Sequence, residues 1–130
     1  MDVLFDDTMQ MLSREMTLRV LKHQVISANI ANAETPGYAR LRMDFETALT
    51  RAAGAREVQA ATHRRHMQAG SDAPAVVYRE RAQRVIGDGN NVVLEQEMKE
   101  LAENQLRYEA AVQLFNKKLN MLKTVIQERA

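Results

Sequence analysis

The sequence contains no cysteine, which excludes a disulfide framework and a thiol nucleophile. Its charges nearly cancel, with 18 basic against 17 acidic residues, and a net charge of +1 gives no strong field for binding nucleic acid or an acidic membrane. No apolar run is long enough to cross a membrane. Residues 1–7 are acidic and lack a basic start, so they do not predict a secretory signal peptide.

Signatures of catalysis are also missing. The sequence has no glycine-rich phosphate loop, no nucleophile elbow and no carboxylate pair in a recognisable frame. His63 and His66 are spaced so that a helix could bring both to one metal ion, but Arg64 and Arg65 between them repel a cation. We therefore predict that the protein is not an enzyme and that it holds no metal and no cofactor.

Proline and glycine are absent from residues 8–32, where apolar residues recur at helical spacing. This pattern predicts a long N-terminal helix. At about 100° per residue its apolar residues fall into two nearly opposite stripes, and one partner helix can cover only one of them. The first stripe contains Met11, Leu18, Leu21, Val25 and Ala28, and the second contains Phe5, Met9, Leu12, Met16 and Val20.

The segment from about residue 91 to residue 127 carries a heptad pattern, which predicts a second long helix in a left-handed supercoil. With the polar Gln105 included, the expected interface residues are Leu94, Met98, Leu101, Tyr108, Val112, Phe115, Leu119, Leu122 and Ile126. Asn90 or Asn91 is expected to cap the start of this helix. A weaker stripe on its far side contains Leu106, Ala110, Leu114, Met121 and Val125.

Between the two helices, periodicity fades over residues 45–88, and small or polar residues dominate. We expect no fixed core there, one short strand over residues 75–78, and a turn at residues 87–90 that leads into the last helix.

The first helix ends in the run Asn-Ile-Ala-Asn-Ala-Glu-Thr-Pro-Gly-Tyr. Thr35 is driven out of the helical region by Pro36, and Gly37 supplies a positive φ, so a turn is predicted there. For Asn29 and Asn32 two interpretations stay open. Either they serve only the end of the helix, or an amide on the apolar face sets the register between helices.

This run resembles the N-terminal signature of bacterial flagellar axial proteins, with matches at Asn29, Ile30, Ala31, Asn32, Thr35, Pro36, Gly37 and Tyr38. Residues 87–98 and 101–108 are similar to the C-terminal signature of the type B proximal rod proteins of that family. The type C rod proteins differ by a Pro-Asn-Val-Asn run, where this chain has Gly89-Asn90-Asn91-Val92.

The resemblance implies a mainly α fold in which long N- and C-terminal helices pair as a coiled-coil-like hairpin, with an irregular, partly extended middle segment. Residues 1–35 would form the N-terminal helix of the axial core domain, residues 36–88 the turn and middle segment, and residues 89–130 the C-terminal heptad helix. Within the first helix, Leu18, Leu21 and Val25 are the expected interface residues.

The resemblance also implies a function. The chain would be a structural subunit of the flagellar basal-body proximal rod, part of the periplasmic drive shaft, self-assembling through its terminal helices. Its partners would be other rod subunits, the basal-body ring and adaptor proteins, and the type III export apparatus, which would export it without a cleavable signal peptide. A soluble coiled-coil adaptor or dimeric regulator is the alternative, since the heptad pattern alone would suffice for one.

Overall fold

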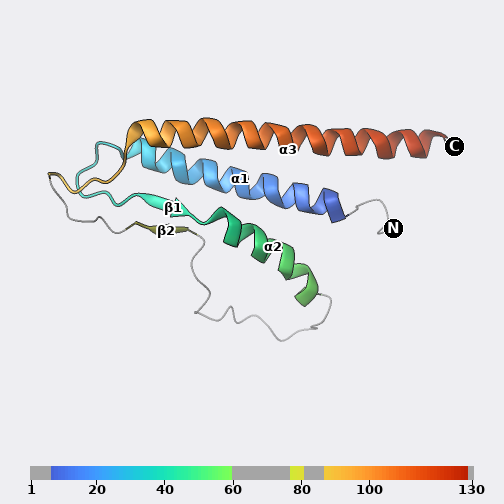
Figure 1. The fold of residues 1–130 in the computed structure, drawn as a ribbon, viewed down its shortest axis with the longest axis horizontal. Helices are drawn as coiled ribbons and strands as arrows, with labels where there is room; N and C mark the ends of the chain where they lie inside the picture. Colours follow the sequence, from blue (N-terminus) through green and yellow to red (C-terminus); the bar gives the residue numbers. More distant parts are fainter. Residues whose placement is uncertain (1–6, 60–76, 81–86, 129–130) are drawn as a thin grey trace.

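Two long helices lie side by side and antiparallel in the computed structural model, which describes residues 7–59, 77–80 and 87–128 (Figure 1). They are α1 (Asp7–Ala31) and α3 (Leu94–Glu128). The end of α1 meets the start of α3, since Asn29 bonds to Glu97, while Met9 and Phe115 line one cavity further along. The predicted mainly α fold with paired terminal helices is therefore confirmed.

The predicted turn after α1 is also confirmed. The Tyr38 N–H donates to the carbonyl oxygen of Thr35 (3.3 Å), and Gly37 between them has a φ of +72°. This geometry, with Pro36 at the second position and a positive φ at the third, is that of a type II turn. It reverses the chain so that the next residues run back along α1.

A short second layer covers one side of the helix pair. The strands β1 (Leu41–Met43) and β2 (Val77–Arg79) are antiparallel, with Met43 opposite Val77. Helix α2 (Phe45–Gln59) follows β1 directly and contacts α1. The expected short strand overlaps β2, whereas His63 and His66 lie outside the described residues.

The sequence analysis did not predict α2. Its start is capped by Asp44, whose Oδ1 accepts a hydrogen bond from the Thr47 N–H (3.1 Å) while its Oδ2 accepts one from the Thr47 hydroxyl (2.7 Å). An Asp followed three residues later by a hydrogen-bonding side chain is an N-cap signal. That signal precedes a run rich in alanine, which favours a helix without needing an apolar stripe.

The expected cap at the start of α3 is wrong. Neither Asn90 nor Asn91 caps the helix, because α3 begins only at Leu94. Both amides are used elsewhere: Asn90 donates to carbonyl oxygens at the end of α1, and the Asn91 Oδ1 accepts a bond from the Arg40 N–H (2.6 Å). The two asparagines therefore join the helices rather than start one.

The apolar core is small. Among the described residues, the buried apolar side chains are Met9, Val25, Ile26, Ala48 and Ala111. The most deeply buried positions of α3 recur every seven residues, at Glu97, Asn104 and Ala111, and two of the three are polar. The contact between the two long helices is thus built around hydrogen-bonding groups.

Candidate functional site: a polar junction between the terminal helices

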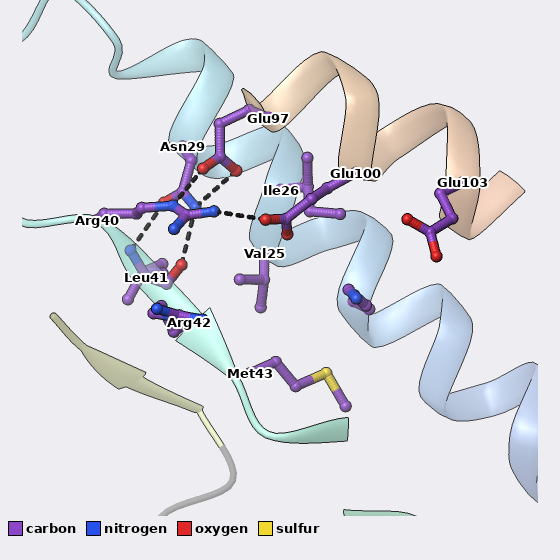
Figure 2. Close-up of a pocket in the computed structure, with 11 residues that line it drawn as sticks. Val25, Ile26, Asn29, Arg40, Leu41, Arg42, Met43, Glu97, Glu100 and Glu103 are labelled. Carbon is purple, nitrogen blue, oxygen red and sulfur yellow. Dashed lines mark hydrogen bonds and ion pairs between the residues drawn. The ribbon is translucent and has the colours of Figure 1, made fainter. Parts of the chain in front are cut away.

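A buried cluster, here named the polar junction, joins α1, β1 and α3 through Asn29, Arg40, Glu97, Glu100 and the backbone of Leu41 (Figure 2). Its members come from three segments that are far apart in the sequence. The turn at Pro36–Gly37 is what returns Arg40 and Leu41 to the end of α1. The junction therefore depends directly on the motif that ends the first helix.

Asn29 makes four hydrogen bonds from a fully buried position. Its Nδ2 donates to the Leu41 carbonyl oxygen (2.8 Å) and to the Glu97 Oε2 (3.0 Å). Its Oδ1 accepts from the Leu41 N–H (2.8 Å) and from the Tyr38 hydroxyl (3.3 Å). The amide thus pairs with Leu41 as a neighbouring strand would, and every donor and acceptor of the side chain is used.

Arg40 and Glu97 form a buried ion pair. The Arg40 Nε donates to the Glu97 Oε1, and its NH2 nitrogen donates to the Glu100 Oε1 at 2.9 Å. A weaker contact joins its NH1 nitrogen to the Glu80 Oε2 at 3.7 Å. Burial alone lowers the pKa of the Arg40 guanidinium, but the bonds to Glu97 and Glu100 outweigh it and raise the pKa. Arg40 therefore carries its charge in the folded chain.

The chain segments on either side of the junction are held by Asn90. Its Nδ2 lies within hydrogen-bond distance of three backbone carbonyl oxygens, those of Asn32 (2.8 Å), Ala33 (2.8 Å) and Thr35 (2.9 Å). The Gly37 N–H donates to the Asp88 carbonyl oxygen at 2.7 Å. These bonds attach the chain that follows the end of α1 to the segment leading into α3.

A second polar contact lies nearly three turns earlier in α1, at Arg19. The Asn104 Nδ2 donates to the Arg19 carbonyl oxygen (2.9 Å), although that residue is in mid-helix. The Arg19 guanidinium lies over the Phe45 ring, 3.8 Å from its centre, and also contacts Glu15 at 3.3 Å. Arg19 therefore links α1 to α2 while Asn104 links α1 to α3.

The hydrogen bonds and ion pairs of the junction hold three segments of the chain together. Its cavity holds about 260 Å³ and is also lined by Lys22, Arg42 and Glu103, so side chains of both charges surround it. Across residues 7–59, 77–80 and 87–128, no three His, Cys, Asp or Glu side chains are grouped to hold a metal ion. What the arrangement can do is couple the end of α1, the first strand and α3 in one alignment.

The matched signature residues divide between two tasks. Asn29 and Tyr38 enter the junction, whereas Asn32 serves the helix end, its Nδ2 donating to the Ala28 carbonyl oxygen (2.8 Å). Asn32 thus serves the helix end and Asn29 contacts α3, and the role of Asn29 in setting the register between the helices stays a prediction. Thr35, Pro36 and Gly37 form the turn on the surface, Ala31 is exposed, and Ile30 is partly buried.

The residues expected at helix interfaces lie in three environments. Val25 is buried. The partly buried residues are Leu18, Leu101, Tyr108, Val112, Phe115 and Leu122. The exposed residues are Leu21, Leu94, Met98, Leu119 and Ile126. The contact with α1 is thus rotated from the centre of the predicted heptad pattern toward Glu97, Asn104 and Ala111, and a role for the exposed members between subunits stays a prediction.

Sequence reasoning missed Arg40, Glu97 and Asn104, the residues that carry most of the polar contacts with α3. A charged or polar residue in a heptad helix is normally assigned to the solvent side, so Glu97 and Asn104 did not stand out, and Arg40 lies in the segment after the turn, where no local pattern marks it. One signal was available. Glu97, Asn104 and Ala111 are seven residues apart, which places them on one side of a supercoiled helix together with Leu101, Tyr108 and Phe115.

Fold and site together define a class of protein: an elongated subunit of two terminal helices, aligned by buried polar groups, with apolar residues left on the outside. A family model described as flagella basal body rod protein matches residues 20–38, which contain the end of α1 and the turn. Among similar proteins named flagellar basal body rod protein FlgB, that of Bacillus subtilis (strain 168) is 33% identical over 95% of both chains.

Two further proteins of that name support the match. The one from Cereibacter sphaeroides is 35% identical over 95% of this chain and 96% of its own length. The one from Salmonella typhimurium (strain LT2) is 30% identical over 94% of both chains. The chain belongs to the flagellar basal body rod protein family.

Proposed function

We propose that this protein is a structural subunit of the flagellar basal-body rod and that it polymerises through its terminal helices. The observation that supports this proposal is the apolar surface that the helix pair leaves uncovered. In the described part of the chain, large apolar side chains are exposed along most of α3, from Leu94 to Ile126, and at Met11, Val20 and Leu21 of α1. Contiguous exposed apolar surface on a folded protein marks a site of interaction with another molecule.

The polar junction fits the same role. A subunit that packs between neighbours needs its helices in one fixed alignment, because a shift of either helix would displace every outward residue at once. Buried hydrogen-bonding groups supply this alignment, since any other register would leave them without partners. The junction therefore fixes how the outward-facing residues of the two helices are placed relative to one another.

Within this proposal the rod lies in the periplasm as part of the drive shaft. The partners are other rod subunits, the basal-body ring and adaptor proteins, and the type III export apparatus that delivers the chain. None of the helices among the described residues has the length and hydropathy to span a membrane. The role is that of an assembly component without catalytic activity. A coiled-coil adaptor is not favoured, because relatives matching along nearly the whole chain carry the rod protein name.

The test is whether an exposed apolar residue is needed for incorporation into the rod. Leu119→Asp places a charge on the surface that is proposed to be buried between subunits, so basal bodies from cells carrying this variant should lack the protein, and the cells should not swim. Asn120→Asp adds the same charge at the next residue, on the polar side of α3, and should leave swimming intact. Normal swimming with Leu119→Asp would contradict the proposal.

A further inference from the structure

Three methionine side chains lie on the outside of the helix pair. Met11 on α1 is 53% exposed, and Met98 and Met121 on α3 are 58% and 59% exposed. The chain has no cysteine and no tryptophan, so methionine is its most easily oxidised residue type. Oxidation of the unassembled chain is therefore expected to begin at these three thioethers, here named the outer methionines.

The other methionines that the structure describes are less accessible. Met9 is only 1% exposed, although it lies two residues from Met11 in the same helix, and Met16 and Met43 are partly buried. Because oxidation follows exposure, the fold divides these residues into an outer set that reacts and an inner set that is protected. Met9 and Met11 provide a matched comparison of the two sets within one helix.

Each outer methionine lies on a different exposed apolar surface. Met11 shares the first stripe of α1 with Leu21, and Met98 lies one turn after Leu94 on α3; both leucines are exposed. Met121 lies about 140° from Met98 around the helix axis, on the weaker stripe of α3. A polar group added at the outer methionines therefore changes three separate apolar surfaces of the subunit.

We propose that the outer methionines are a reversible oxidation site that controls whether the subunit enters the rod. This inference rests on the proposed function, in which the exposed apolar surfaces become buried between subunits. The oxidant is a peroxide, a two-electron oxygen donor. The modification takes place before assembly, because a side chain that is already buried in the rod is out of reach of the oxidant.

The reaction is an oxygen transfer to sulfur. With hydrogen peroxide, the methionine sulfur attacks one peroxide oxygen, an S–O bond forms as the O–O bond breaks, and one water molecule is released. The sulfur loses the two electrons that the peroxide gains. A methionine sulfoxide reductase reverses the change, since two electrons and two protons restore the thioether and release the oxygen as water.

The sulfoxide acts on assembly and not on folding. In the single chain each outer methionine is more than half exposed, so the sulfoxide oxygen stays hydrated and the packing of α1 against α3 is unchanged. When the same surface is buried in the rod, that oxygen loses its water, and an apolar surface offers it no donor in exchange. Oxidation therefore disfavours incorporation while the stability of the subunit itself is retained.

Peroxide treatment of the purified full-length protein tests the accessibility of the sulfurs. Mass spectrometry of peptides should show sulfoxide forming at Met11 roughly tenfold faster than at Met9, or more, because their exposed fractions are 53% and 1%. Protein oxidised only at the outer methionines should keep its urea unfolding midpoint. Equal rates at Met9 and Met11, or a lowered midpoint, would overturn the inference.

Competition in cells tests the effect on assembly. Cells that lack methionine sulfoxide reductase and make no other copy of this chain produce two tagged chains, one unmodified and one with Met11→Leu, Met98→Leu and Met121→Leu. Leucine is apolar, favours a helix as well as methionine does, and is not oxidised by peroxide. Both chains are produced with or without hydrogen peroxide, and their ratio in isolated basal bodies is measured.

The ratio without peroxide is the reference. With peroxide it should shift toward the leucine variant by roughly tenfold, the effect of burying one unpaired polar group, and restoring the reductase should abolish the shift. An unchanged ratio, or no sulfoxide at Met98 in the unassembled chain, would overturn the inference and leave the rod assignment intact. Absence of both chains from basal bodies without peroxide would instead contradict the proposed function.

Discussion

Replacing Glu97 by alanine tests whether the polar junction, rather than the small apolar core, aligns the two helices. The substitution leaves the Arg40 guanidinium buried without its main carboxylate partner and leaves one donor of Asn29 unpaired. Removing one member of a buried ion pair costs about 3–5 kcal/mol. Because Arg40 keeps its bond to Glu100, we expect a loss near the lower limit, about 3 kcal/mol.

A loss of that size is a large part of the stability of a small domain, which is roughly 5–15 kcal/mol. Urea unfolding of the full-length protein, followed by circular dichroism, should give a clearly lower midpoint for Glu97→Ala at an unchanged slope. Glu109→Ala is a suitable control, because that carboxylate lies on the same helix, is exposed, and accepts a hydrogen bond from Gln105 at the surface, outside the junction.

A double variant separates the ion pair from simple loss of packing. If Glu97→Leu is combined with Arg40→Leu, no charge remains buried without a partner, so much of the stability lost in Glu97→Leu alone should return. A Glu97→Ala midpoint that matches the unmodified protein, or a double variant less stable than the sum of the single changes, would refute the reasoning.

Three further predictions concern the segments around the junction. Gly37→Ala should destabilise the chain by about 1–2 kcal/mol in urea unfolding, because a φ of +72° strains an alanine although its Cβ would meet no atom, and Gly37→Asn should cost less. Hydrogen bonds from Thr47 lower the pKa of the Asp44 carboxyl below its ordinary value of 3.8. The Asp44 cap therefore stabilises α2 at pH values above 3.8, and this stabilisation is lost as the pH falls from 3.8 through the lowered pKa. Amide exchange at Thr47 should show this loss, and Asp44→Asn should abolish the pH dependence. Asn90→Ala removes the amide shared by three carbonyl groups and should lower stability by about 1–3 kcal/mol, whereas unchanged exchange at Thr35 and Gly37 would count against that role.

The sequence predicted the elements that depend on local rules. Helical spacing without proline or glycine predicted both long helices, and the Thr-Pro-Gly order predicted the turn, since each depends on residues close together in the chain. Helix α2 was missed because its sequence has no apolar stripe, and its local signals are only the Asp44 cap and the alanine content. The cap at Asn90 or Asn91 was wrong because tertiary contacts claim both side chains.

The polar junction could not have been derived in the same way. Its geometry depends on how far the chain after Gly37 returns along α1, which brings Arg40 opposite Glu97 at a separation of 57 residues. The heptad pattern specified that α3 pairs with a helix, but not which residues face it. Leu101, Tyr108 and Phe115 lie at the edge of the observed contact, and its centre at Glu97 and Asn104 is polar.

The pairing of β1 with β2 lets the fold accept a longer segment between these two strands. Met43 lies opposite Val77, so the segment between these residues leaves and returns at nearly the same point. The Glu80 N–H donates to the Arg40 carbonyl oxygen (2.8 Å), and the Gly37 N–H donates to the Asp88 carbonyl oxygen (2.7 Å). These bonds hold the chain before and after that segment next to the helix pair. Once the two ends of a loop are fixed, doubling its length costs only about 0.6 kcal/mol of closure entropy. Extra sequence inserted after α2, even a whole folded module, could therefore project from the side of the subunit without shifting α1 against α3.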